Sequence, residues 1–129
     1  MSHHDAARVA EFFSGRPGAL PVFERAARQI RARFPGTTLR VQKTQIAFDD
    51  PYGFAFIWLP PKRGTCATLS FVLAYPLETP RVPHVTFIRH DRYTHHLPLD
   101  ETHGVDDEVL RWLEEAHDLM RAMRHVKRL

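Results

Sequence analysis

The chain has 129 residues, of which 43% are apolar, and a formal net charge of +3 at neutral pH. This length and apolar content are typical of a single compact domain, spanning residues 1–129, that folds around one core. The only cysteine, Cys66, excludes an intramolecular disulfide, and neither a signal peptide nor an apolar run long enough to span a bilayer is visible. We therefore expect a cytoplasmic protein with no membrane partner.

Two helices are expected within residues 5–34, after a frayed segment at 1–4. Asp5 is a suitable cap for the first helix. The second carries apolar side chains at three- and four-residue steps, which is the pattern of a helix with one buried face. These residues are Leu20, Phe23, Ala27, Ile30 and Phe34. Pro35 and Gly36 then end the helix.

The region that contains the second helix is strongly basic. Seven Arg or Lys side chains lie between Arg16 and Lys43, against a single acid, Glu24. A basic helix face usually serves only as a solvated surface, and the alternative is contact with a polyanion.

A sheet is expected over residues 37–99, with its middle at residues 40–58. Apolar residues alternate on both sides of the K-T-Q step at 43–45, but they change from odd to even positions across it. We interpret this step as a bulge or short bend, since one extra residue reverses the facing of everything downstream. Residues 49–53 suit a turn. The run 54–59 is apolar on both parities, which indicates a central strand covered on both faces.

Three more strands are expected after this central hairpin. Residues 66–73 alternate between an apolar and a more polar face. Residues 84–89 and 94–99 are joined by a polar tip and form a hairpin. Pro98 has no N–H to donate to a neighbouring strand, so the last strand is predicted to lie at an edge of the sheet.

The last helix, expected over residues 105–126, has clear start signals. Asp106 can cap it, and Val105 and Leu110 are spaced for a hydrophobic contact across the cap. Its buried stripe is expected to comprise Val109, Leu113, Ala116, Met120 and Met123.

The resulting element order is α-α-β-β-β-β-β-α. It predicts an α+β fold with an antiparallel sheet of about five strands and with the N-terminal and C-terminal helices packed on one face. The predicted core contains Leu39, Phe56, Leu69, Phe71, Phe87, Leu97 and Leu113, together with Phe23 and Ile30.

Five histidines between His84 and His103 raise the question of a metal site. His95 and His96 are adjacent on a predicted strand, so they point to opposite faces and cannot readily hold the same ion. The chain also has no glycine-rich phosphate loop and no nucleophile motif. We therefore expect no metal, no cofactor and no catalytic residue set.

A polar and largely cationic set of residues on or near the sheet remains as a candidate ligand site. Its members are Arg40, Lys43, Thr44, Gln45, Trp58, Arg89, Arg92 and His95. Arginine offers forked contacts to an anion, and an aromatic ring offers a stacking surface. The set predicts a binding module for a small anionic ligand or a protein partner, with nucleic acid less favoured, unless the residues form only a solvated sheet face.

The alternative is a small enzyme in which Lys43 and His95 act as acid and base. Burial can tune the pKa of a lysine toward neutrality, and histidine titrates there already. No third, orienting group is visible in the sequence, and we therefore favour the binding module.

Five separated strings resemble a known family. They are F-F-S-G-R-P-G-A-L-P-V-F-E (12–24), V-Q-K-T-Q-I-A-F (41–48), F-A-F-I-W-L-P (54–60), Y-T-H-H-L-P-L (93–99) and V-D-D-E-V-L-R-W-L-E-E-A (105–116). Together they look like a small bacterial family catalogued as domain of unknown function 5655. The resemblance covers nearly the whole chain and implies a compact α+β domain with Lys43, Thr44 and His95 at recognisable positions. It implies no established activity.

The chain resembles the YdhG-like domains more distantly. Those relatives are sometimes described as frataxin-like iron chaperones, which implies iron delivery as an outside alternative. The expected helices lack the run of Asp and Glu that such a role needs, and the net positive charge disfavours an acidic surface that collects iron.

Overall fold

The computed structural model of the chain describes residues 3–61 and 66–128, with side chains described as far as residue 123. Its elements are α1 (His3–Phe12), the short 3-10 helix η1 (Pro17–Ala19), α2 (Leu20–Arg33), β1 (Thr38–Val41), β2 (Ile46–Asp49), β3 (Gly53–Trp58), β4 (Ala67–Leu73), β5 (His84–Arg89), β6 (Arg92–Leu99) and α3 (Asp107–Arg128). Because α1 begins at His3, only residues 1–2 of the segment expected to fray lie outside the described residues.

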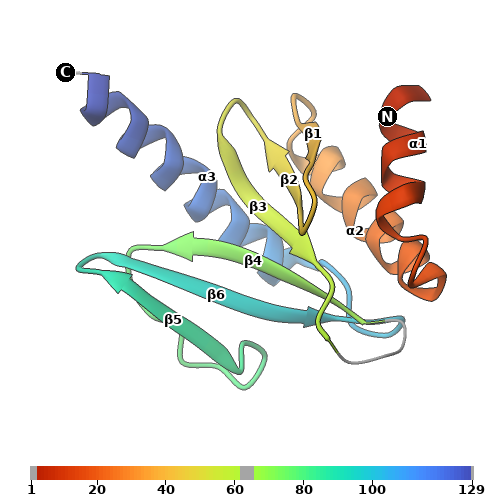
Figure 1. The fold of residues 1–129 in the computed structure, drawn as a ribbon. Coiled ribbons are helices and arrows are strands. Elements are labelled where there is room, and N and C mark those ends of the chain that lie inside the picture. Colours follow the sequence, from red (N-terminus) through yellow and green to blue (C-terminus); the bar gives the residue numbers. More distant parts are fainter. Residues whose placement is uncertain (1–2, 62–65, 129) are drawn as a thin grey trace.

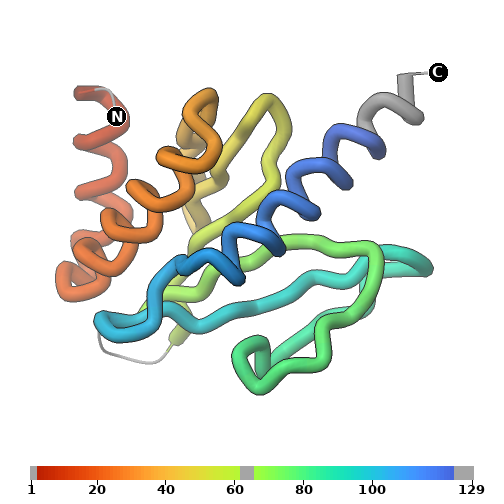
Figure 2. The backbone as a smooth tube through the Cα atoms, turned by 180° about the vertical axis from the view of Figure 1, so that it is seen from behind, coloured from red at the N-terminus to blue at the C-terminus, as the bar shows by residue number. Residues whose placement is uncertain are grey.

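The α+β class is confirmed, and the described part of the chain forms six antiparallel strands where about five were expected. Their order in the sheet is β1-β2-β3-β4-β6-β5. Helices α2 and α3 lie on one side of the sheet, behind it in Figure 1 and in front of it when the molecule is turned (Figure 2), and α1 stands beside the edge strand β1. The other face carries no helix among the described elements, and it is called the open face below.

The extra strand arises at the K-T-Q step, which is a chain reversal and not a bulge or bend within one strand. The backbone N–H of Gln42 donates to the carbonyl oxygen of Gln45 at 2.8 Å, and this bond closes a tight turn between β1 and β2. Leu39 lies directly opposite Phe48. Opposite residues in an antiparallel pair face the same side of the sheet, so the change from odd to even positions is what a hairpin produces.

The central hairpin is confirmed, because β2 pairs with β3 across the turn at 49–53. Strand β3 lies third in the sheet, between β2 and β4. The described helices cover only one of its faces. On the open face Phe56 and Trp58 are half-buried, so the prediction of a strand covered on both faces was only partly right.

The prediction that the last strand forms an edge was wrong. Strand β6 lies between β4 and β5, and β5 is the edge strand. Pro98 is tolerated because β5 is too short to reach it. The pairing of β5 with β6 begins at His84 opposite His96, two residues before the proline, so the missing N–H removes no bond to β5.

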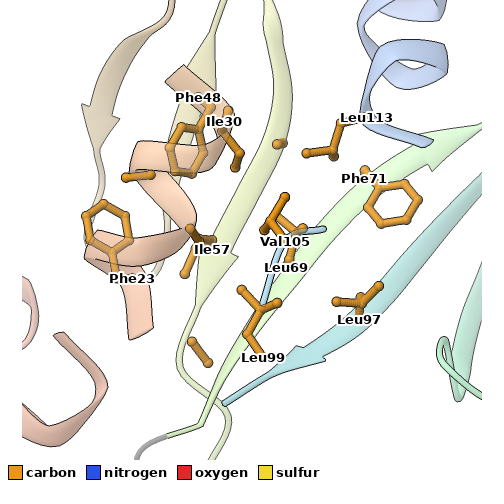
Figure 3. Packing of buried hydrophobic residues seen from close by; sticks show 14 of the residues in the cluster. Phe23, Ile30, Phe48, Ile57, Leu69, Phe71, Leu97, Leu99, Val105 and Leu113 are labelled. Atoms are coloured by element: carbon orange, nitrogen blue, oxygen red, sulfur yellow. The ribbon is translucent and has the colours of Figure 1, made fainter. Parts of the chain in front are cut away.

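The core lies between the sheet and the helices (Figure 3). The buried part of the predicted set comprises Phe23, Ile30, Leu69, Phe71, Leu97 and Leu113, and Leu39 packs against it while half-buried. Phe56 and Phe87 were assigned to this core wrongly. Phe56 pairs with Ser70 and faces away from the helices. Phe87 lies on the outermost strand and is 63% exposed.

Helix α3 begins as the sequence indicated. The side chain of Asp106 accepts a hydrogen bond from the backbone N–H of Val109 at 3.1 Å, which is the geometry of an N-terminal cap. Arg81 pairs with both Asp106 and Glu108 and ties the loop before β5 to this helix start. None of the helices in the described part of the chain combines the length and the apolar character needed to cross a membrane.

Candidate functional site

The eight residues predicted to bind a ligand fall in separate parts of the fold. Lys43, Thr44 and Gln45 lie in or beside the β1–β2 turn, Arg40 on β1, Trp58 at the end of β3, Arg89 and Arg92 at the β5–β6 hairpin, and His95 on β6. Strands β1 and β5 are the two edges of the sheet that the described residues form, with four strands between them. The structure therefore does not bring the whole set onto one surface.

His95 is fully buried on the helix side of the sheet. Its Nδ1 bonds to the carbonyl oxygen of Tyr93 at 3.0 Å, and its Nε2 accepts the backbone N–H of Leu77 at 2.9 Å. The ring therefore carries its proton on Nδ1 and stacks on Phe71, with 5.3 Å between ring centroids. Burial lowers the pKa of His95. Lys43 is exposed on the β1–β2 turn, so the two residues of the acid–base alternative do not share a site.

Two of the predicted arginines are already engaged. Arg40 makes a forked contact with Asp49, with N–O distances of 2.9 and 3.1 Å. This hydrogen-bonded carboxylate raises the pKa of Arg40 and neutralises much of its charge on the open face. Arg92 reaches toward α3, where its Nε lies 3.0 Å from the sulfur of Met123.

A chain of side-chain hydrogen bonds crosses the open face of the sheet. The Trp58 indole N–H donates to Ser70 Oγ at 2.7 Å, and Ser70 Oγ lies 2.8 Å from His96 Nδ1. The indole can only donate, so Ser70 Oγ accepts that bond. The other ring nitrogen of His96, Nε2, lies 3.2 Å from Thr86 Oγ1, so the ring is hydrogen-bonded on both sides. Burial lowers the pKa of His96, with a smaller contribution from nearby His84.

The contact between Ser70 and His96 has the distance of a nucleophile and its base. Ser70 is only 6% exposed, however, and its oxygen already accepts the indole bond. We therefore assign the network to holding β3, β4, β6 and β5 together. Even numbering along the strands places Trp58, Ser70 and His96 on one face, but the sequence did not reveal that β6 lies beside β4.

A cavity of about 470 Å³ lies between α1 and the β1–β2 turn. It is lined by Arg8, Glu11, Phe12, Val41, Gln42 and Lys43. Arg8 Nη2 donates to the carbonyl oxygen of Val41 at 2.8 Å, which holds the guanidinium beside the edge of β1. Within the described part of the chain neither Arg8 nor Lys43 forms an ion pair. The sequence identified Lys43 but missed Arg8, because no local pattern joins α1 to the turn.

No three His, Cys, Asp or Glu side chains in residues 3–61 and 66–123 lie close enough together to hold one metal ion.

The described residues form a small α+β domain with a six-stranded antiparallel sheet and a basic cavity at one edge. The family model described as "Domain of unknown function (DUF5655)" matches residues 9–120, most of the chain. The chain therefore belongs to this family, as the five strings indicated. No curated protein and no solved structure matched the chain.

Proposed function

We propose that this domain is a non-enzymatic binding module that takes an anionic ligand, either a small anion or an anionic group of a partner protein, in the cavity between α1 and the β1–β2 turn. The observation that carries the proposal is the meeting of Arg8 and Lys43 at one hollow. Arg8 comes from helix α1 and Lys43 from the β1–β2 turn.

The chemistry of the lining suits an anion. A guanidinium offers a flat fork of donors, and an ammonium adds a compact charge. Arg8 is already held by Val41, so little freedom is lost when a ligand binds. The carboxamide of Gln42 accepts from Gln45 through its oxygen at 2.9 Å, which leaves its N–H groups able to donate. Among the lining residues that the structure describes, Glu11 is the single acid.

The volume is also suitable, since small-molecule sites commonly span about 300 to 1,000 Å³. The open sheet face supports anion binding less well. Arg40 on that face is paired with Asp49, and the lowered pKa of His96 keeps the His96 ring uncharged near neutral pH. The site of the proposed module is therefore the edge of the sheet rather than its face.

Replacing Lys43 by Met is expected to weaken anion binding about tenfold while leaving the melting temperature nearly unchanged. The lost contact is charge-assisted, and such contacts contribute about 1.5 to 3 kcal/mol. Lys43 is exposed, and surface substitutions usually change stability by about 0.5 kcal/mol or less. Inorganic phosphate and tripolyphosphate are the probes, followed through the backbone amide resonances of Arg8, Gln42, Lys43 and Thr44. These resonances should move together, and less as salt rises.

Arg89→Met is the matched control, because Arg89 is an exposed cation at the opposite edge of the sheet. Equal weakening by both variants would show a diffuse attraction to the basic surface and would contradict the proposal. A loss of several kcal/mol of stability in Lys43→Met, with no phosphate-induced shifts in the wild type, would make Lys43 a structural part of the turn.

A further inference from the structure

A second hollow lies between α2 and β1, with a volume of about 420 Å³. Its lining comprises Phe23, Glu24, Ala27, Arg28, Arg31 and Ala32 from α2 and Leu39 from β1. It lies on the helix side of the sheet, since Leu39 faces the same side as its buried partner Phe48. None of these residues lines the cavity beside Lys43.

The floor of this groove is apolar and hollow because two of the α2 side chains that line it are alanines. Ala27 and Ala32 are too short to fill the space above Leu39, which stays half-buried. Phe23 is fully buried below them. The result is a concave apolar surface open to solvent, able to cover part of an aliphatic chain.

The rim of the groove is cationic. Arg28 and Arg31 both line it, and neither forms an ion pair or a side-chain hydrogen bond with any residue that the structure describes. Glu24 lies one helical turn before Arg28, yet the two make no ion pair within 4 Å. Two unneutralised guanidinium groups therefore stand beside an apolar floor, and they are part of the basic stretch between Arg16 and Lys43.

We infer that this groove binds a single-chain anionic amphiphile, such as an alkyl carboxylate. The aliphatic chain lies against Ala27, Ala32 and Leu39, and the carboxylate takes hydrogen bonds from Arg28 and Arg31. Charge complementarity selects this occupant, because a neutral chain would leave both guanidinium groups unpaired. A simple inorganic anion would leave the apolar floor uncovered. The inference concerns a different site from the cavity beside Lys43 and stands independently of it.

Binding of dodecanoate, octanoate and dodecyltrimethylammonium, each below its micelle concentration, tests the inference on the full chain by calorimetry and amide chemical shifts. Dodecanoate is expected to bind more tightly than octanoate, since each methylene buried on the floor strengthens binding about fourfold. Dodecyltrimethylammonium has the same chain with the opposite charge and is expected to bind at least about tenfold more weakly. Shifts should concentrate on α2 and Leu39.

Two variants separate the floor from the rim. Ala32→Leu fills the hollow from an exposed helical position and is expected to weaken dodecanoate binding about tenfold without lowering the melting temperature. Arg28→Gln combined with Arg31→Gln is expected to remove the preference for the anionic chain. Arg111→Gln on α3 removes an exposed cation outside the groove and is the control, which should bind as the wild type does.

The inference is overturned if dodecanoate does not bind, if both charge types bind equally, or if Ala32→Leu leaves the affinity unchanged. Binding of an acidic amphipathic peptide in the groove without binding of dodecanoate would assign the surface to a protein partner and would also overturn it. Lys43→Met should retain dodecanoate binding. The proposal for this groove and the proposal for the cavity beside Lys43 can therefore be contradicted independently.

Discussion

Replacing Phe71 by alanine is expected to destabilise the domain by about 3 to 5 kcal/mol. Phe71 is fully buried on β4 and stacks between two aromatic neighbours, His95 on β6 and Trp112 on α3. Removing the ring leaves a cavity at the point where the helix meets two strands. Chemical denaturation followed by far-UV circular dichroism measures the loss.

Phe87→Ala is the matched comparison, because Phe87 is also a phenylalanine on this sheet but is 63% exposed. It buries little area, so its truncation should cost less than about 1 kcal/mol. Equal losses for the two variants would show that the burial assigned to Phe71 is wrong.

The stability of the domain is expected to decrease as the pH is lowered from about 7 to 5, with His95 as a main cause. Burial holds the pKa of His95 below its ordinary value of 6.5. At a pH between the pKa of His95 in the folded chain and its pKa in the unfolded chain, the unfolded chain binds a proton that the folded chain does not. Lowering the pH therefore favours unfolding. The loss begins near pH 6.5 and levels off below the pKa of the folded state. The pKa of His96 is also lowered, so His96 adds to the loss of stability at low pH.

Each such group contributes a slope of at most about 1.4 kcal/mol per pH unit. Denaturation at pH 7, 6 and 5 measures this slope in the wild type and in His95→Phe. The variant should show a smaller slope, together with a loss of about 1 to 3 kcal/mol at pH 7, because the N–H of Leu77 loses its acceptor. His90→Gln changes a histidine side chain that is 93% exposed and is the control. If the slope is not smaller in His95→Phe, groups other than His95 cause the dependence of stability on pH.

Much of the fold follows from local patterns. The start of α3 was readable because a cap, a hydrophobic contact and an apolar stripe agree over a short stretch. The K-T-Q step shows the limit of such reading. A bulge and a two-strand hairpin both change the parity of apolar positions, and only the partner of β1 distinguishes them. That partner is β2, and the pairing of Leu39 with Phe48 settles the choice.

Which of the candidate site residues lie together depends on the order of the strands in the sheet, and the sequence predicted that order only in part. Adjacent His95 and His96 were expected on opposite faces, and this is confirmed by their different surroundings. The position of β6 between β4 and β5 was not readable, since Pro98 indicated an edge. Because the strand order was unknown, residues that lie at opposite edges of the sheet were predicted to form one cationic surface. Arg8 and Lys43 line the same cavity only because tertiary packing places α1 beside the β1–β2 turn, and no local sequence pattern indicates this.

The two edges of the sheet differ in a way that limits how copies of the chain can associate through strands. At one edge β1 is short, α1 lies beside it, and Arg8 occupies the carbonyl group of Val41. At the other edge, β6 is the sole neighbour of β5 among the described strands, and β5 exposes Phe87 and Ile88. Strand addition is therefore open to β5 but obstructed at β1. Two copies joined through β5 would be related by a two-fold axis and would present only their obstructed edges, so such pairing stops at a dimer and does not propagate into a fibre.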